Sequence, residues 1–452
     1  MIFRLVEQEG ISRKVVAVCG VILVLLAQVA RAQSPGLPAS PNWPKWATVR
    51  RQFQANAYAW SLDGKHFAYS DSAGVWLVDA PDFDRPRLVQ KTESVSQVAW
   101  SPDASRLAFV GIHRVPVGVR SERPIQSTIW ITDLEGSPAT DLLPAGSIAQ
   151  PEHQIDIFHI ESWLPSNKIA FSTGVGTGYV EHFAVDTKSG EIHRFCDSTG
   201  QFFWALDGRT AIVQNDAPQG DTPSGLGLLQ FARAWSHPSP SCSTLVQTPA
   251  QAILDFNDWS SDSAEVTYTA STSREGSDDL FPTLYKWSVN DEAIEIFMRG
   301  AECGSWSSDN RQLALLALGH LFYGRNREFK GTREPYNQAS LVVLNLAERA
   351  LSGVVRLPDS MVKTISNQFG SRSECPKWGL GGKVSFLAPD GTVYLLRTGQ
   401  PAARTRSFKL PVGNFDRIAP WSVEWSPDGK WLVVNNLHFG REKPLVTLLE
   451  PQ

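Results

Sequence analysis

The chain has little cysteine and methionine and no excess of charge of either sign. Its 452 residues include 5 Cys and 3 Met, and 42 Lys and Arg stand against 46 Asp and Glu. Nucleic-acid binders carry a strong basic excess, so we expect no nucleic-acid partner. The sequence holds no CxxC motif or Cys/His cluster for a zinc site. It also lacks the G-x-S-x-G elbow of serine hydrolases, so peptidase or esterase activity is not expected.

Long apolar runs are absent except at the N-terminus. Arg13 and Lys14 precede an apolar run over residues 15–30, and Ala30-Arg-Ala32 fits a small-x-small cleavage site. This pattern predicts a secretory signal peptide over residues 1–32; an uncleaved membrane anchor is the alternative. Residues 33–45 are rich in Pro and Ser and are interpreted as a linker. We therefore expect an exported protein, periplasmic or extracellular, with no integral membrane span after cleavage.

Tryptophan and turn residues are abundant, and they repeat. Each copy is a tryptophan, a short polar turn and a run of β-forming residues, and the copies begin at Trp60, Trp100, Trp163, Trp204, Trp259, Trp306, Trp378 and Trp425. A repeat of this length is typical of a β-propeller. The sequence predicts an all-β fold, an eight-bladed propeller of four-stranded antiparallel blades over residues 46–452. A tryptophan-rich β-sandwich is the alternative, but it does not explain copies in one register.

The two ends of the chain predict how the propeller closes. The last repeat has strands near residues 422–425, 431–435 and 444–449 and then ends one strand short. Residues 48–51 precede Trp60 by the same offset as residues 88–91, a predicted fourth strand, precede Trp100. We expect residues 48–51 to pair with the third strand of the last repeat, because closure removes exposed sheet edges.

The acidic and histidine residues near the repeats have mainly structural interpretations. The aspartate of each turn (Asp63, Asp103, Asp207, Asp262, Asp309 and Asp428) is predicted to cap that turn with its side chain. Asp255, Asp258 and Asp262 form a local cluster without the glycine and distal glutamate of a calcium loop. His153 and His159 are candidate metal ligands near the centre of the fold, but isolated histidines are more often structural. We predict no cofactor and no metal site.

The repeats resemble a known family. Trp-Ser-Pro-Asp-Gly-Lys at residues 425–430 is similar to the WD40-like repeat of the TolB β-propeller, and residues 60–65 and 100–103 are close variants. Similar repeats occur in the propellers of prolyl oligopeptidase and dipeptidyl-peptidase relatives. The resemblance spans residues 46–452 and implies a rigid propeller that is often an interaction platform. Related repeats also occur in an oligogalacturonate lyase family in which axial histidines hold a metal. A metal-assisted lyase or hydrolase near the axis is therefore the alternative function.

The long loops of the predicted blades favour binding at one face. Connections from second to third strands, and from each blade to the next, fall on one face, and most long loops lie there, including residues 112–126, 214–224, 270–281, 319–339 and 358–375. One loop combines aromatic and basic residues, which are typical of recognition sites: Phe322, Tyr323, Arg325, Arg327, Lys330, Arg333 and Tyr336. We expect a non-catalytic binding platform for a protein, peptide or envelope polysaccharide, with a solvated loop as the alternative.

The cysteines outside the signal segment predict at least one disulfide. Cys303 and Cys375 each lie three residues before a motif tryptophan. They therefore occupy equivalent positions on the innermost strands of consecutive blades, where Cα atoms come within the reach of a disulfide. Parity favours a second bond between Cys196 and Cys242. Their predicted positions on opposite faces oppose it, so that pairing stays open.

Overall fold

The computed structural model describes most of the chain after residue 42. The ranges outside the description are residues 1–42, 93, 115–124, 136, 144–154, 176–179, 198–199, 216–224, 232–243, 248–252, 274–279, 292, 324–326, 329–338, 349, 359–374, 389, 400–404, 411–420, 437–444 and 452. The chain separates into residues 1–42 and residues 43–452. The predicted signal peptide, most of the predicted linker, and Arg325, Lys330, Arg333, Tyr336 and Cys242 lie outside the described residues.

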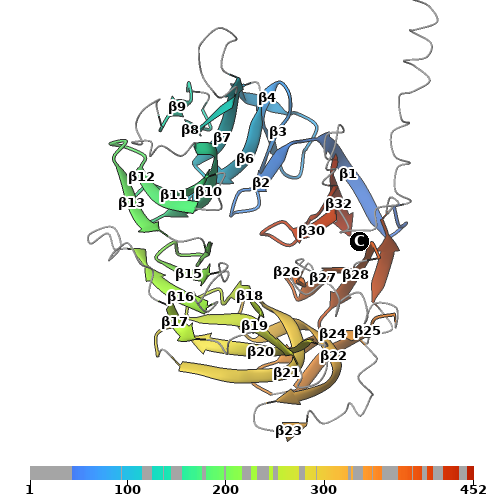
Figure 1. Cartoon of the computed structure of the whole chain (residues 1–452). Coiled ribbons are helices and arrows are strands. Elements are labelled where there is room, and N and C mark those ends of the chain that lie inside the picture. The colour runs from blue at the N-terminus through green and yellow to red at the C-terminus, as the bar shows by residue number, and fades with distance from the viewer. Residues whose placement is uncertain are drawn as a thin grey trace, which may run out of the picture. The chain divides into compact units, whose positions relative to one another are not determined.

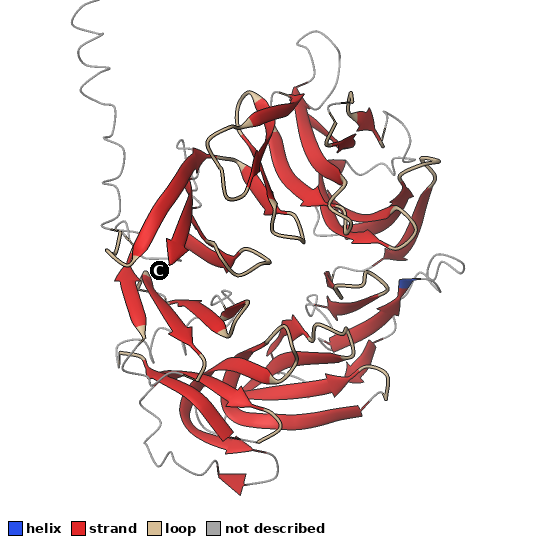
Figure 2. Cartoon of the chain, turned by 180° about the vertical axis from the view of Figure 1, so that it is seen from behind, coloured by secondary structure: helices blue, strands red, loops and turns tan. Residues whose placement is uncertain are grey.

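The described residues form antiparallel sheets that follow one another in chain order (Figures 1 and 2). The first contains β2 (Ala57–Trp60), β3 (His66–Ser70), β4 (Gly74–Asp79) and β5 (Arg87–Lys91). The second contains β6 (Val95–Trp100), β7 (Arg106–Arg114), β8 (Ile125–Asp133) and β9 (Thr140–Asp141). The third contains β10 (Ile155–Leu164), β11 (Lys168–Val175), β12 (Val180–Asp186) and β13 (Ile192–Asp197). The fourth contains β14 (Gln201–Trp204), β15 (Thr210–Asn215), β16 (Gly225–Gln230) and β17 (Thr244–Gln247).

The next two repeats share one eight-stranded sheet. It contains β18 (Ile253–Trp259), β19 (Glu265–Ser273), β20 (Leu280–Ser288), β21 (Ala293–Trp306), β22 (Gln312–Tyr323), β23 (Arg327–Glu328), β24 (Ala339–Asn345) and β25 (Ala350–Arg356). The repeats merge because β21 is the last strand of one and the first strand of the next. The register of β21 against β22 shifts between Arg299 and Ala301. Gly300, at that shift, has a φ of 72°, a conformation that glycine adopts without strain.

The last two sheets include both ends of the described chain. One contains β26 (Lys377–Gly379), β27 (Lys383–Leu387), β28 (Thr392–Arg397) and β29 (Arg406–Lys409). The other contains β30 (Trp421–Trp425), β31 (Leu432–Asn436), β32 (Leu445–Pro451) and, at its edge, β1 (Ala47–Gln54). The predicted pairing is confirmed: Thr48 lies opposite Glu450 and Val49 opposite Leu449. An N-terminal strand thus completes the sheet that the C-terminal repeat leaves one strand short (Figure 1).

The predicted aspartate turns are confirmed. In the first, Ser61 Oγ donates to Asp63 Oδ1 at 2.6 Å, and the same oxygen of Asp63 accepts from the Lys65 N–H at 3.0 Å. Ser61 Oγ also accepts from the His66 N–H, which fixes the start of the second strand. The same arrangement recurs at Asp103, Asp262, Asp309 and Asp428, while Asp207 accepts from the Arg209 N–H. The shared sequence position therefore reflects a shared structural role.

The motif tryptophans lie between successive sheets, as the repeats predict. The indole of Trp100 donates to the carbonyl of Ala59, the residue that precedes the motif tryptophan of the previous sheet. Three other pairs repeat this bond: Trp163 with Ala99, Trp259 with Phe203, and Trp378 with Ser305. Each bond satisfies a buried donor and joins neighbouring innermost strands. In these four repeats the innermost strand is therefore joined to that of the repeat before it.

The core is divided into apolar clusters between consecutive repeats. One includes Val98 and Leu107 of the second sheet with Val75 of the first, and another includes Val384 with Leu341. A further cluster joins the last sheet to the first, with Trp431 and Val433 beside Phe67 and Phe83. The ring of Phe83 meets that of Trp431 edge to face at 5.0 Å. The last and first repeats therefore share an apolar cluster.

Two tryptophans before β1 also join the core. Trp43 and Trp46 pack on the cluster that contains Phe408 and Trp425, and their rings lie 6.0 and 5.7 Å from that of Phe408. Trp43 falls in the segment that the sequence predicts as a linker. Among the helices of the described residues, none is long and apolar enough to span a membrane.

Candidate functional site

The long connections between strands gather at one end of the sheets, which we call the long-loop end. Second strands run into third strands there, and each repeat runs into the next. Long intervals of sequence separate the strand ends found here, for example between β7 and β8, β9 and β10, β15 and β16, and β25 and β26. At the opposite end, the turn end, first and second strands are joined by short turns such as residues 61–65. One long interval falls at the turn end, because β16 ends at Gln230 there and β17 begins at Thr244.

Three of the predicted binding residues lie in strands. We expected a loop over residues 319–339, but β22 continues through Tyr323 and pairs with β23. Phe322 lies opposite Glu328 in this pairing, and Tyr323 lies opposite Arg327. The structure therefore places the backbone of three of the predicted residues on one hairpin at the long-loop end. The other four are outside the described residues.

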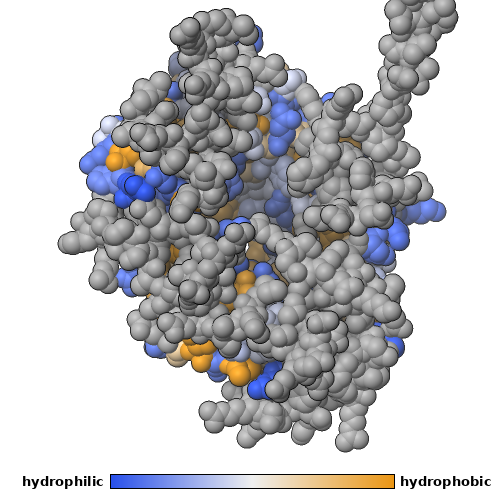
Figure 3. All heavy atoms as spheres, viewed as in Figure 1, coloured by the Kyte–Doolittle hydropathy of each residue, from blue (hydrophilic) through white to orange (hydrophobic). Residues whose placement is uncertain are grey.

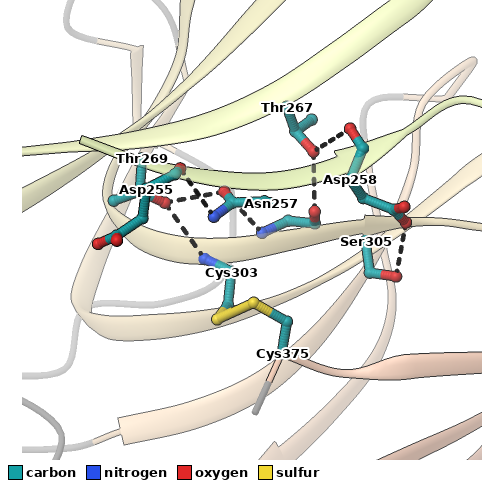
Figure 4. The surroundings of a disulfide bond; sticks show 9 residues. Asp255, Asn257, Asp258, Thr267, Thr269, Cys303, Ser305 and Cys375 are labelled. Atoms are coloured by element: carbon teal, nitrogen blue, oxygen red, sulfur yellow. Dashed lines mark hydrogen bonds between the residues drawn. A yellow bond between two sulfur atoms is a disulfide. The ribbon is translucent and has the colours of Figure 1, made fainter. Parts of the chain in front are cut away.

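The expected disulfide between Cys303 and Cys375 is present (Figure 4). It joins Cys303 of β21 to Cys375, two residues before the start of β26, with the two Cα atoms 4.9 Å apart. Cys303 has a φ of 59°, where the register of β21 shifts between Glu302 and Ser305. The Cys303 N–H donates to Thr269 Oγ1 at 3.3 Å. The bond thus links the innermost strands of two repeats and also contacts the second strand of a third, β19, near the long-loop end.

A buried carboxyl group lies beside this disulfide. Glu302 is 6% exposed, and its Oε1 atom has no hydrogen-bond partner among the described residues. Burial, together with the nearby charge of Asp255, raises the pKa of Glu302 to about 8. Glu302 is therefore protonated in the folded chain at neutral pH, a state that a buried, unpaired carboxyl group favours.

Four polar side chains connect the innermost strands of several repeats. Burial and the neighbouring Glu424 carboxylate raise the pKa of Tyr58, whose hydroxyl hydrogen-bonds Glu424. Burial raises the pKa of Glu424, and the exposed Lys377 opposes that change. Burial also raises the pKa of Asp258, against the opposing effects of the Trp306 N–H, the Ser305 hydroxyl and Lys377. The positive charge of Lys377 therefore favours the ionised form of both carboxyl groups, Asp258 and Glu424.

Sequence reasoning missed these inner-strand charges, although a signal was present. Asp258, Lys377 and Glu424 each immediately precede a motif tryptophan. Ser305 occupies the same position and donates to Asp258 at 2.9 Å across neighbouring strands (Figure 4). Polar side chains at this position in different repeats therefore face one another. A comparison of the repeats at that single position would have found the set.

The candidate metal ligands are placed as follows. His159 is exposed on β10, and His153 is outside the described residues. His182 Nδ1 lies 2.6 Å from Glu161 Oε1, and Glu161 also accepts from the Trp204 indole at 3.1 Å. Both members of this pair are buried, and they join the third sheet to the fourth. Over the described residues, no three His, Cys, Asp or Glu side chains are grouped to hold a metal ion.

A small pocket opens between the first, second and last sheets. Its volume is about 200 Å³, and it is lined by Ala55, Asn56, Ala57, Tyr58, Ser96, Gln97, Val98 and Asn435. The lining residues come from the starts of β2 and β6 and from the end of β31, so the pocket lies toward the long-loop end. Figure 3 shows hydrophilic described residues in a hollow near the middle of the face in view.

Comparisons with known proteins found similar solved structures. No family model and no curated protein sequence matches the chain. Among solved structures, an oligogalacturonate lyase in complex with manganese has a TM-score of 0.47 at 12% identity, covering 91% of this chain and 92% of that one. The Dos1 propeller has a TM-score of 0.49 at 11% identity, covering 89% and 95%. TolB from Acinetobacter baumannii has a TM-score of 0.35 at 14% identity, covering 84% and 87%. Each of these solved structures is similar to the chain over more than four fifths of its residues at low sequence identity.

Proposed function

We propose that residues 46–452 form an eight-bladed β-propeller closed by the pairing of β1 with β32. The eight motif tryptophans lie on the first strands of eight units, and two of these units share β21. The apolar cluster around Phe83 and Trp431 joins the last unit to the first. In a closed ring every innermost strand has a neighbour on each side, so one end of the molecule presents a continuous rim of loops.

We propose further that this propeller is an exported, non-catalytic binding platform whose partner docks at the long-loop end. The observation that carries the proposal is the distribution of connections. Nearly all the long ones meet at that end, whereas the turn end is built from repeated, internally hydrogen-bonded turns. Variable loops on a rigid scaffold are the usual location of binding residues. The partner is a protein, a peptide or an envelope polymer.

We propose that the predicted binding residues in and around the hairpin of β22 and β23 provide basic and aromatic groups for the partner. We expect Arg325, Arg327 and Arg333 to contact the partner, because arginine contributes disproportionately at interfaces. Export is proposed from the basic residues and apolar run at the N-terminus. The partner would then be met outside the cytoplasm.

The test replaces charges at the two ends in parallel. One variant carries Arg325→Ala, Arg327→Ala and Arg333→Ala; the matched control carries Lys65→Ala, Arg209→Ala and Lys430→Ala at the turn end. Each full-length protein is used for affinity capture from an envelope extract, with the melting temperature measured beside it. We expect the first variant to lose captured material while both variants melt like the parent, since exposed charges contribute little to stability. Loss of capture only in the control would show that the wrong end was chosen.

A further inference from the structure

The pocket between the first, second and last sheets carries an inference about the ligand. Its volume of about 200 Å³ exceeds the roughly 30 Å³ that one water occupies in the liquid. It is smaller than the roughly 300–1,000 Å³ of pockets for drug-sized ligands. The space therefore suits a single ring-sized group.

One wall of the pocket holds an unused buried hydrogen-bond acceptor. Asn435 is 5% exposed, and within the described part of the chain its Oδ1 atom has no hydrogen-bond partner. The amide group of Asn435 is held in place, because its side chain hydrogen-bonds the Tyr58 hydroxyl. An unpaired buried carbonyl oxygen costs about 1–3 kcal/mol, so a ligand that donates a hydrogen bond here would recover that cost.

The neighbouring network fixes Asn435 in this orientation. The Tyr58 hydroxyl also interacts with Glu424 and Ser422. A phenol hydroxyl donates one hydrogen bond and accepts others, so it donates to the Glu424 carboxylate and accepts from the hydroxyl of Ser422 and the amide of Asn435. The acceptor on Asn435 is therefore directed away from Tyr58 by a set of bonds that involves three strands.

The remaining lining groups indicate an uncharged ligand. Among the described residues around the pocket, none carries a charge. Gln97 is not available, because its amide donates to the Ile160 carbonyl at 2.6 Å and accepts from the Ile160 N–H at 2.7 Å. The exposed Ser96 hydroxyl and the half-buried Asn56 amide can each donate or accept. Tyr58 and the alanine and valine side chains add an apolar surface.

We propose that this pocket binds one uncharged sugar residue. Hydroxyl groups of a neutral sugar donate to Asn435 and exchange hydrogen bonds with Ser96 and Asn56, while its C–H surface packs on Tyr58 and Val98. An acidic sugar would meet no cation in the described lining, and a cationic ligand would meet no carboxylate. This inference rests on the proposed function, since it places a sugar unit of an envelope polymer near the long-loop end.

The experiment measures binding of monosaccharides to the full-length protein. Saturation-transfer NMR and calorimetric titration would use D-glucose, N-acetyl-D-glucosamine, D-galacturonate as the anionic probe and butylamine as the cationic probe. Asn435→Ala removes the buried acceptor, and Ser96→Phe blocks the pocket from an exposed position without disturbing the core. Leu206→Phe, at an exposed site of the turn end, is the control.

We expect at least one neutral sugar to bind. Both pocket variants should weaken the affinity for that sugar by about fivefold or more, which is the effect of losing one buried hydrogen bond. The Leu206 variant should bind like the parent. Binding of galacturonate or butylamine alone, neutral sugar binding that survives Ser96→Phe, or no neutral sugar binding at 50 mM would each overturn the inference. The arginine variants of the long-loop end test the proposed function separately. If partner capture depends on these arginines but no sugar binds, the binding platform is retained and only the sugar site is discarded.

Discussion

The indole Nε1 of Trp259 donates a hydrogen bond of 2.9 Å to the backbone carbonyl of Phe203. Phe203 directly precedes Trp204, the motif tryptophan of the previous sheet, so this bond joins equivalent points of two neighbouring innermost strands. Trp306 is as deeply buried as Trp259, at 5% against 6% exposed, but its Nε1 has no partner among the described residues. A comparison of the two residues therefore separates the contribution of the hydrogen bond to stability from that of packing.

We predict that Trp259→Phe destabilises the protein more than Trp306→Phe. Both substitutions remove similar apolar volume, but only the first leaves a carbonyl without its donor. The additional loss should be about 1–2 kcal/mol in the free energy of unfolding, measured by urea denaturation. Equal losses would show that the tryptophans act by packing alone.

Deleting residues 46–52 removes most of β1 and should lower the melting temperature sharply. The deletion uncovers β32 as a sheet edge and removes the N-terminal strand that packs the last repeat to the first, and exposed edges promote aggregation. Differential scanning calorimetry and light scattering would measure both effects. Deletion of residues 33–42 is the control, because β1 is kept. A melting curve unchanged by the first deletion would contradict closure through β1.

The protonation of Glu302 should make stability depend on pH. The carboxyl group keeps its proton to about pH 8 in the folded chain, against an ordinary pKa of 4.5. The folded state therefore binds more protons than the unfolded state between these values, and the free energy of unfolding falls as pH rises through that window.

Replacing this residue tests the effect. Glu302→Gln has no proton to release, so we expect the variant to gain stability relative to the parent from pH 5 to pH 8, by up to about 1.4 kcal/mol per pH unit. Urea denaturation at both pH values gives the difference. Glu348→Gln, at an exposed position between β24 and β25, should show no such trend. A constant difference between parent and Glu302→Gln would refute the prediction.

The disulfide should contribute measurably to stability. Cys303 and Cys375 are 72 residues apart in sequence, and closing a loop of that length contributes at most about 4 kcal/mol in the chain-entropy account. We expect Cys375→Ser to lower the free energy of unfolding by part of that amount, and Cys196→Ser to have a smaller effect. Peptide mapping without reduction should recover Cys303 and Cys375 as one linked pair. Two free thiols in exported protein would exclude the bond.

The sequence by itself determined the repeats and whatever repeats in register. The turn aspartates, the tryptophans between sheets, the pairing of residues 48–51 with the last repeat and the Cys303–Cys375 bond all follow from equivalent positions. Such features are predictable because each depends on a short local pattern or on two copies of the same pattern. Strand ends were less predictable, since the extension of β22 through Tyr323 depends on its pairing with β21 and β23.

Only the tertiary structure decided which side chains of different repeats meet. Tyr58, Glu424 and Asn435 lie at opposite ends of the chain and become neighbours because the last sheet packs on the first. The pocket beside them, and the burial that keeps Glu302 protonated, depend in the same way on neighbours far away in sequence. The physical reason is that desolvation and hydrogen-bond satisfaction are set by all surrounding atoms, whereas turns and strand alternation are set by the chain near each residue.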